Sequence, residues 1–102
     1  MDYIFIERDG DKNTIEEYKK NALAKDTKTL VQDYNEQCRM GIVGVHEQAL
    51  CLVGMSLAFK ERFCESPIYL EGNTLSMKGE IEIVANKLFY LNKEKKYELP
   101  GK

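Results

Sequence analysis

The chain has 102 residues, of which 43% are hydrophobic and 31% are charged, a composition typical of a globular protein rather than a disordered or fibrous one. This length predicts a single domain over residues 1–102. Lys and Arg number 15 against 17 Asp and Glu, for a formal net charge of −2. Nucleic-acid-binding domains usually carry a basic excess, so we expect no nucleic-acid partner.

The N-terminal residues predict a strand. Residues 3–7 alternate and are rich in aromatic and β-branched side chains. If Ile4 and Ile6 point toward the core, then Tyr3 and Phe5 lie on the outer face of the sheet. The N-terminus has neither a basic region nor an apolar run of the length found in secretory signals, so we expect a cytoplasmic protein.

Residues 13–39 predict helical structure in one or two pieces. Asn13 is a good N-cap, and Glu16 follows three residues later, as in a capping box. Asp26 or Thr27 could cap a second start. The sequence therefore leaves open whether this segment is one kinked helix or two helices.

A long apolar helix is predicted from about Val43 to Phe63. Its second half, Ala49 to Phe59, is apolar except for Ser56. A surface helix normally has one polar face, so this helix must be covered all round, either by the fold or by a homodimer through the helix around Val53. Residues 54 and 58, glycine and alanine, permit close approach of another helix. The apolar run is shorter than the ~20 residues of a membrane helix, and we expect no membrane association.

The C-terminal third predicts antiparallel strands. Gly72-Asn73 is a two-residue hairpin signal between Ile68–Glu71 and a half-buried strand that alternates from Thr74 to Ile83. This turn would create three cross-strand pairs: Ile68–Met77, Tyr69–Ser76 and Leu70–Leu75.

A second hairpin is expected at Ala85–Lys87. A three-residue loop there would place Ile83 opposite Phe89 and Glu82 opposite Tyr90. One face of the sheet would then pack on the helices. Its apolar residues would be Ile68, Leu70, Leu75, Met77, Ile81, Ile83, Phe89 and Leu91.

The opposite face combines aromatic and charged side chains, and we take it as the candidate partner-binding surface. Such surfaces suit protein recognition, whereas the acidic side chains would repel a phosphate backbone. The alternative is that the C-terminal tail or another strand covers this face. The candidate residues are Tyr69, Lys78, Glu80, Glu82 and Tyr90, joined by Tyr3 and Phe5 if the first strand enters the sheet.

These elements predict an α+β fold. We expect an antiparallel three- to four-stranded sheet with two or three helices packed on one face, in the order β-α-α-β-β-β. Residues 92–102 would form a charged, partly flexible tail.

His46 is the only histidine. Near a helix N-terminus it could act as a neutral acid–base group. Glu47 follows it directly, and adjacent residues point apart on a helix, so these two are not natural partners. Cys51 does not share a face well with His46, which weakens a nucleophilic pair. His46 and Glu47 remain the candidate ligand-binding residues, and a capping or interface histidine is the structural alternative.

Neither a metal nor a cofactor is expected. The cysteines at 38, 51 and 64 lack metal-ligand spacing, and without export they should be free thiols. Asp9–Asn13 is similar to the start of a calcium loop, but Thr14 and Lys20 stand where that loop needs glycine and glutamate.

The sequence therefore favours a small, acidic, non-catalytic protein that binds and neutralises or regulates a protein partner, as immunity proteins, antitoxins and inhibitors do. The alternative is an oligomeric protein that binds or sequesters a small ligand in a pocket near His46. A small enzyme using His46 comes third.

Overall fold

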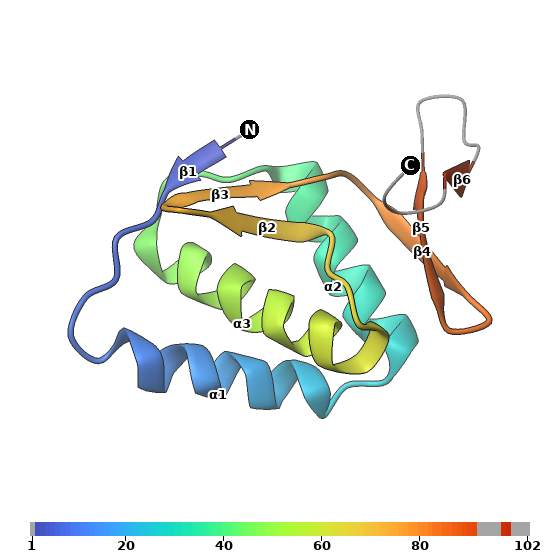
Figure 1. Cartoon of the computed structure of the whole chain (residues 1–102), viewed down its shortest axis with the longest axis horizontal. Helices are drawn as coiled ribbons and strands as arrows, with labels where there is room; N and C mark the ends of the chain where they lie inside the picture. Colours follow the sequence, from blue (N-terminus) through green and yellow to red (C-terminus); the bar gives the residue numbers. More distant parts are fainter. Residues whose placement is uncertain (1, 92–96, 99–102) are drawn as a thin grey trace.

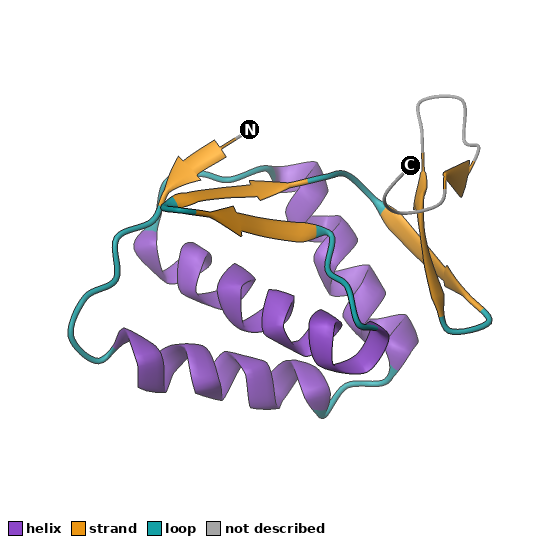
Figure 2. Ribbon diagram, in the orientation of Figure 1, coloured by secondary structure: helices purple, strands orange, loops and turns teal. Residues whose placement is uncertain are grey.

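The computed structural model describes residues 2–91 and 97–98. The fold is α+β with antiparallel strands, as predicted (Figure 1 and Figure 2). In chain order its elements are β1 (Asp2–Ile4), α1 (Asp11–Leu23), α2 (Thr27–Met40), α3 (His46–Phe63), β2 (Ile68–Glu71), β3 (Thr74–Met77), β4 (Ile81–Val84), β5 (Lys87–Leu91) and β6 (Tyr97–Glu98). Apart from Tyr97 and Glu98, the predicted tail lies outside the described residues.

The segment before α3 forms two helices, which answers the question that the sequence left open. The Asp26 carboxylate caps α2 by accepting a hydrogen bond of 2.8 Å from the Thr29 N–H, and this bond lowers the pKa of Asp26. Helix α1 begins at Asp11 rather than after the predicted cap, Asn13, and Gly10 precedes it with φ +86°. The Asp11 carboxylate accepts a hydrogen bond from the Arg8 N–H, which holds the preceding turn.

Helix α3 is the centre of the fold. It begins at His46, later than predicted, because Gly44 has φ +83° and Val45 is extended. Figure 1 shows the sheet of β1, β2 and β3 on one side of α3 and α1 on the opposite side, with α2 behind. Leu52 is fully buried, whereas 37% of Leu57 is exposed. The fold thus covers this apolar helix on three sides and leaves a strip open.

In the described part of the chain the strands form two sheets instead of the single predicted one, in the orders β1-β3-β2 and β4-β5-β6. The predicted continuous strand from Thr74 to Ile83 is broken at Gly79, which has φ +128°. Residues other than glycine rarely adopt this backbone conformation. The second hairpin therefore leaves the first sheet and packs beside α2 (Figure 2).

The registers of the two hairpins differ in how well they were predicted. The pairs of β2 with β3 are confirmed, including Leu70 with Leu75. The predicted pairs of β4 with β5 are wrong by one residue, because the turn has two residues, Ala85 and Asn86, with φ +52° and +64°. The observed pairs are Ile81–Tyr90, Glu82–Phe89, Ile83–Leu88 and Val84–Lys87.

The alternation of the first strand is the reverse of the one expected. Ile4 is 60% exposed and Ile6 is 65% exposed, whereas Phe5 is buried. In the main-chain register, Tyr3 pairs with Leu75 of β3. The Phe5 N–H donates to the Asn73 carbonyl at 2.6 Å, which holds Phe5 beside the first sheet. Every residue from 3 to 6 is apolar or aromatic, so hydrophobicity alone could not distinguish the two faces.

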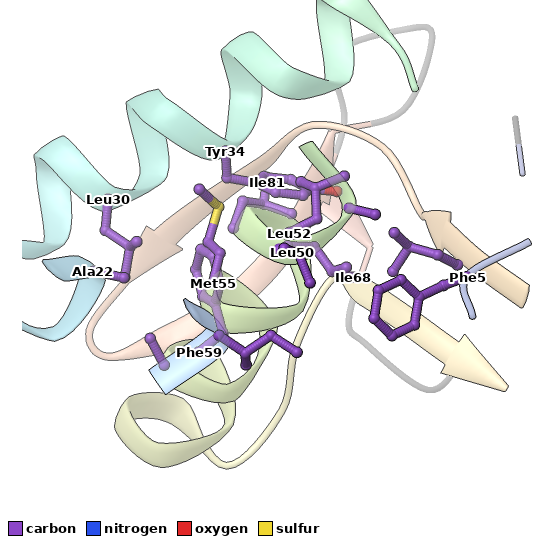
Figure 3. Packing of buried hydrophobic residues seen from close by; sticks show 14 of the residues in the cluster. Phe5, Ala22, Leu30, Tyr34, Leu50, Leu52, Met55, Phe59, Ile68 and Ile81 are labelled. Carbon is purple, nitrogen blue, oxygen red and sulfur yellow. The ribbon is translucent and has the colours of Figure 1, made fainter. Parts of the chain in front are cut away.

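The core joins α3 to α2 and both hairpins (Figure 3). The rings of Tyr34 and Phe59 meet edge to face, with centroids 5.8 Å apart. The buried Tyr34 hydroxyl donates to the Gly79 carbonyl at 2.7 Å, which satisfies its polar group. Burial raises the pKa of Tyr34. Within the described part of the chain, none of the helices combines the length and the apolarity that crossing a membrane requires.

Candidate functional site

Three of the predicted partner-binding residues lie together where the two sheets join. Tyr69 comes from β2, Lys78 follows β3, and Tyr90 comes from β5. The Lys78 ammonium lies 4.9 Å from the centroid of the Tyr69 ring, within cation–π range. Burial raises the pKa of Tyr90, and a hydrogen bond with Tyr69 raises it further. We call these three residues the junction cluster.

The backbone at the junction positions the cluster. The Lys78 N–H donates to the Pro67 carbonyl at 2.9 Å, just before β2, and the Leu91 N–H donates to the Glu80 carbonyl at 2.9 Å. These two bonds tie the linker between the sheets to its neighbours on both sides. The cluster is therefore set by main-chain contacts and by the turn at Gly79.

The other predicted partner-binding residues do not form one face with the cluster. Glu80 lies beside it and pairs with Arg39, with 3.6 Å between Oε1 and Nη1. Glu82 is opposite Phe89 and points to the other side of the hairpin from Tyr90. Phe5 is buried and cannot contribute to an exposed face. The side chain of Tyr3 lies outside the described part of the structure.

His46 has a side-chain partner that sequence reasoning missed. Its Nε2 lies 2.8 Å from Oδ2 of Asp11, and its ring stacks on Phe5 with centroids 5.5 Å apart and planes 9° apart. Asp11 is 35 residues away in sequence, so no local pattern indicated this contact. The expected capping by backbone groups is replaced by a carboxylate and an aromatic ring.

The pKa of Asp11 reflects this environment. Burial acts to raise it, but the hydrogen bond from the Arg8 N–H and the contact with His46 outweigh burial, so the pKa lies below its ordinary value. Asp11 therefore remains a carboxylate and orients the imidazole. The pair joins the start of α1 to the start of α3 and, through Phe5, to the residues after β1.

Glu47 points away from His46, as predicted, and accepts a hydrogen bond from the Tyr18 hydroxyl. This bond raises the pKa of Tyr18 to about 12. Both residues border an open hollow of about 380 Å³ between α1 and the first turn of α3. Its lining is entirely polar apart from the tyrosine ring: Asn13, Thr14, Glu17, Tyr18, Asn21 and Glu47. His46 is not part of this lining.

The chemistry available around His46 is limited. The only side chain hydrogen-bonded to it within the described ranges is Asp11, so no hydroxyl or thiol is set to act as a nucleophile there. Cys64 is exposed, and Cys38 and Cys51 are half-buried free thiols whose pKa is raised by burial. Between residues 2 and 91 and at residues 97–98, no three metal-binding side chains cluster.

Comparison of the chain with protein-family models found no match. Comparison with curated proteins found no significant match either, and neither did comparison with solved structures.

Proposed function

We propose that this chain is a small, non-catalytic protein-binding module that regulates or neutralises a protein partner through the junction cluster. The observation that supports this proposal most is the packing of Lys78 over Tyr69 beside Tyr90. Tyrosine side chains lose little conformational entropy on binding and offer both an apolar ring and a polar hydroxyl. A cluster already held by neighbouring side chains needs less ordering when a partner binds.

The charge around the cluster suggests what kind of partner it would bind. Glu80 and Glu65 flank the cluster, and Glu65 also contributes to the raised pKa of Tyr90. The whole chain carries a net charge of −2. A net negative charge of the whole chain accelerates association with a basic protein, as expected of an immunity protein, an antitoxin or an inhibitor.

Affinity capture from the source cell, with tagged wild-type protein, tests this proposal. Tyr69→Ala and Lys78→Ala should abolish capture of a protein that the wild type retains, and Lys87→Ala on β5 should not. With the captured partner purified, each cluster variant should weaken binding by at least about tenfold, or 1.4 kcal/mol. Equal capture by the wild type and both cluster variants, all with native circular dichroism, would refute it.

The hollow beside Glu47 supports a second candidate function, the binding of a small ligand. Its two carboxylates, Glu17 and Glu47, and its amides would favour a ligand with cationic hydrogen-bond donors. Isothermal titration with small amines tests this function. Heat that disappears in Glu47→Gln but not in Lys87→Ala would support it, and absence of binding by the wild type would rule it out.

A further inference from the structure

Helix α2 holds the segment where the chain passes from the first sheet to the second. The Tyr34 hydroxyl donates to the Gly79 carbonyl at 2.7 Å. The neighbouring Asn35 amide bonds to both main-chain groups of Ile81, at 2.9 and 2.8 Å. Figure 1 shows α2 beside the hairpin of β4 and β5. Side chains of one helix therefore bind the linker between the sheets at both of its ends.

These contacts differ in how firmly they can hold the linker. Tyr34 is fully buried, with 0% of its surface exposed. Arg39 of α2 also reaches the linker, where it pairs with Glu80, but 59% of the Arg39 side chain is exposed, and exposed ion pairs stabilise little. Asn35 is half-buried and binds the first residue of β4. Tyr34 is thus the contact of α2 that holds Gly79 itself from within the core.

The Tyr34 hydroxyl also lies against the segment that enters the first sheet. Its oxygen is 3.4 Å from the Pro67 carbonyl, which accepts the Lys78 N–H at 2.9 Å. Tyr69 follows Pro67 by two residues, and Lys78 directly precedes Gly79. The main-chain segments that carry two of the three residues of the junction cluster therefore meet at one buried hydroxyl.

We infer that Tyr34 is the positioning residue of the junction cluster. It acts through the main chain at Gly79 and Pro67, and so holds the Lys78 ammonium 4.9 Å from the centroid of the Tyr69 ring. The consequence for partner binding rests on the proposed function, whereas the effect on the geometry of the cluster does not. The two can therefore be tested separately.

The linker needs this hydroxyl because Gly79 is free to rotate. Without it the Gly79 carbonyl would face the edge of a phenyl ring, and a polar group that loses its hydrogen bond inside the protein is destabilising. Glycine tolerates many backbone conformations, so the linker can turn the carbonyl toward water and carry Lys78 away from Tyr69. The Cys38 thiol also makes a hydrogen bond with the Gly79 main chain, but thiols form only weak ones.

Nuclear magnetic resonance of Tyr34→Phe tests the inference. This change removes only the hydroxyl and keeps the ring that packs edge to face on Phe59, so the variant should fold. Protons above an aromatic ring resonate upfield, so the Lys78 side-chain methylene protons report the geometry of the cluster. Their upfield displacement, measured against Tyr69→Leu, should be largely lost in Tyr34→Phe. An unchanged displacement overturns the inference.

A matched control separates positioning from loss of stability. Ile15 is buried on α1, which packs on α3 on the side opposite the first sheet (Figure 1). Ile15→Val removes one buried methylene and so destabilises the protein, but it leaves the linker untouched. The Lys78 resonances of this variant should match those of the wild type. If they move as far as in Tyr34→Phe, the effect is a general loosening of the fold and the inference is wrong.

A second measurement uses the wild type alone. The Tyr34 hydroxyl proton should exchange slowly with water and should show a nuclear Overhauser effect to the Gly79 α protons, because the hydroxyl is buried and bonded to this residue. A hydroxyl proton that exchanges as fast as that of free tyrosine overturns the inference without any variant.

Binding distinguishes this inference from the proposed function. The probe is the protein that the wild type retains in affinity capture, once purified. Tyr34→Phe should weaken its binding by about tenfold, as the cluster variants do, and Ile15→Val should not. If Lys78→Ala binds like the wild type, the proposed function fails, while a lost Lys78 displacement in Tyr34→Phe still supports the positioning role. If Lys78→Ala loses binding and Tyr34→Phe keeps it, the role of Tyr34 is refuted instead.

Discussion

Gly54 of α3 lies so close to Tyr18 of α1 that a Cβ at position 54 would stand 2.6 Å from the Tyr18 Cβ. It would also stand 2.9 Å from the Ile15 carbonyl oxygen and the Lys19 nitrogen. Two of these three atoms are main-chain atoms, so the contact cannot be relieved by a rotamer change. The two helices pack closely because residue 54 has no side chain, as the sequence predicted for a helix approaching this position.

We therefore expect Gly54→Ala to destabilise the protein by at least about 2 kcal/mol, because α1 must move away from α3. Urea denaturation followed by circular dichroism measures this change. Lys60→Ala, on an exposed position of α3, should change stability by less than about 0.5 kcal/mol. If the two variants were equally stable, the close approach of α1 and α3 would be wrong.

Sequence patterns predicted the parts of the fold whose signals are local. Gly72-Asn73 specified the register of β2 and β3, because Gly72, with φ +57°, suits the first turn position of a two-residue hairpin. Asp26 marked the start of α2 because its carboxylate can cap the first turn of a helix. The second hairpin was misread because Ala85 adopts a left-handed conformation that its residue type does not suggest.

The remaining differences depend on contacts between distant residues. Gly79 could have indicated the break between the two sheets, since glycine inside a strand pattern often marks a bend, but its neighbours continue the alternation. Asp11 is held by His46, and Lys78 packs on Tyr69 only after the chain turns at Gly79. For the junction cluster, the sequence predicted the residue types but not which of them meet.

Ala85 offers a test of the second turn. A left-handed conformation costs an alanine about 1–2 kcal/mol, part of which glycine recovers. Ala85→Gly should therefore stabilise the protein by about 0.5–1 kcal/mol in thermal or urea denaturation. Ala24→Gly provides the control, because Ala24 has φ −76° and glycine should destabilise there. Destabilisation by Ala85→Gly would contradict the two-residue turn.

Asp11 should make stability depend on pH in the acid range. Its pKa is lowered in the folded protein, so its stabilising contribution is complete above the unfolded value of about 4 and is lost as pH falls through the folded pKa. Unfolding free energy should therefore decrease as pH falls below about 4. Urea titrations across this range should give a shallower decrease for Asp11→Asn. Asp26, whose pKa is also lowered, would account for part of the remaining slope, and identical slopes in both proteins would exclude a role for Asp11.

Asn35 connects α2 to the second hairpin. Its amide nitrogen donates to the Ile81 carbonyl at 2.9 Å, and its amide oxygen accepts from the Ile81 N–H at 2.8 Å. Replacement by alanine removes both bonds, so Asn35→Ala should cost about 2 kcal/mol. Hydrogen exchange of the Ile81 amide should accelerate in this variant. Asn35→Asp keeps the acceptor but loses the donor, and should protect the Ile81 amide better than alanine does. Unchanged exchange in both variants would mean that this connection does not hold the hairpin.

The cover of α3 organises the whole fold, and two leucines on this helix test that cover directly. Leu52 is fully buried, whereas 37% of Leu57 is exposed. Leu52→Ala should lower the unfolding free energy by about 3 kcal/mol and Leu57→Ala by less than about 1 kcal/mol. Urea denaturation of the two variants measures this difference. Equal losses, or a larger loss at Leu57, would contradict the three-sided cover of α3.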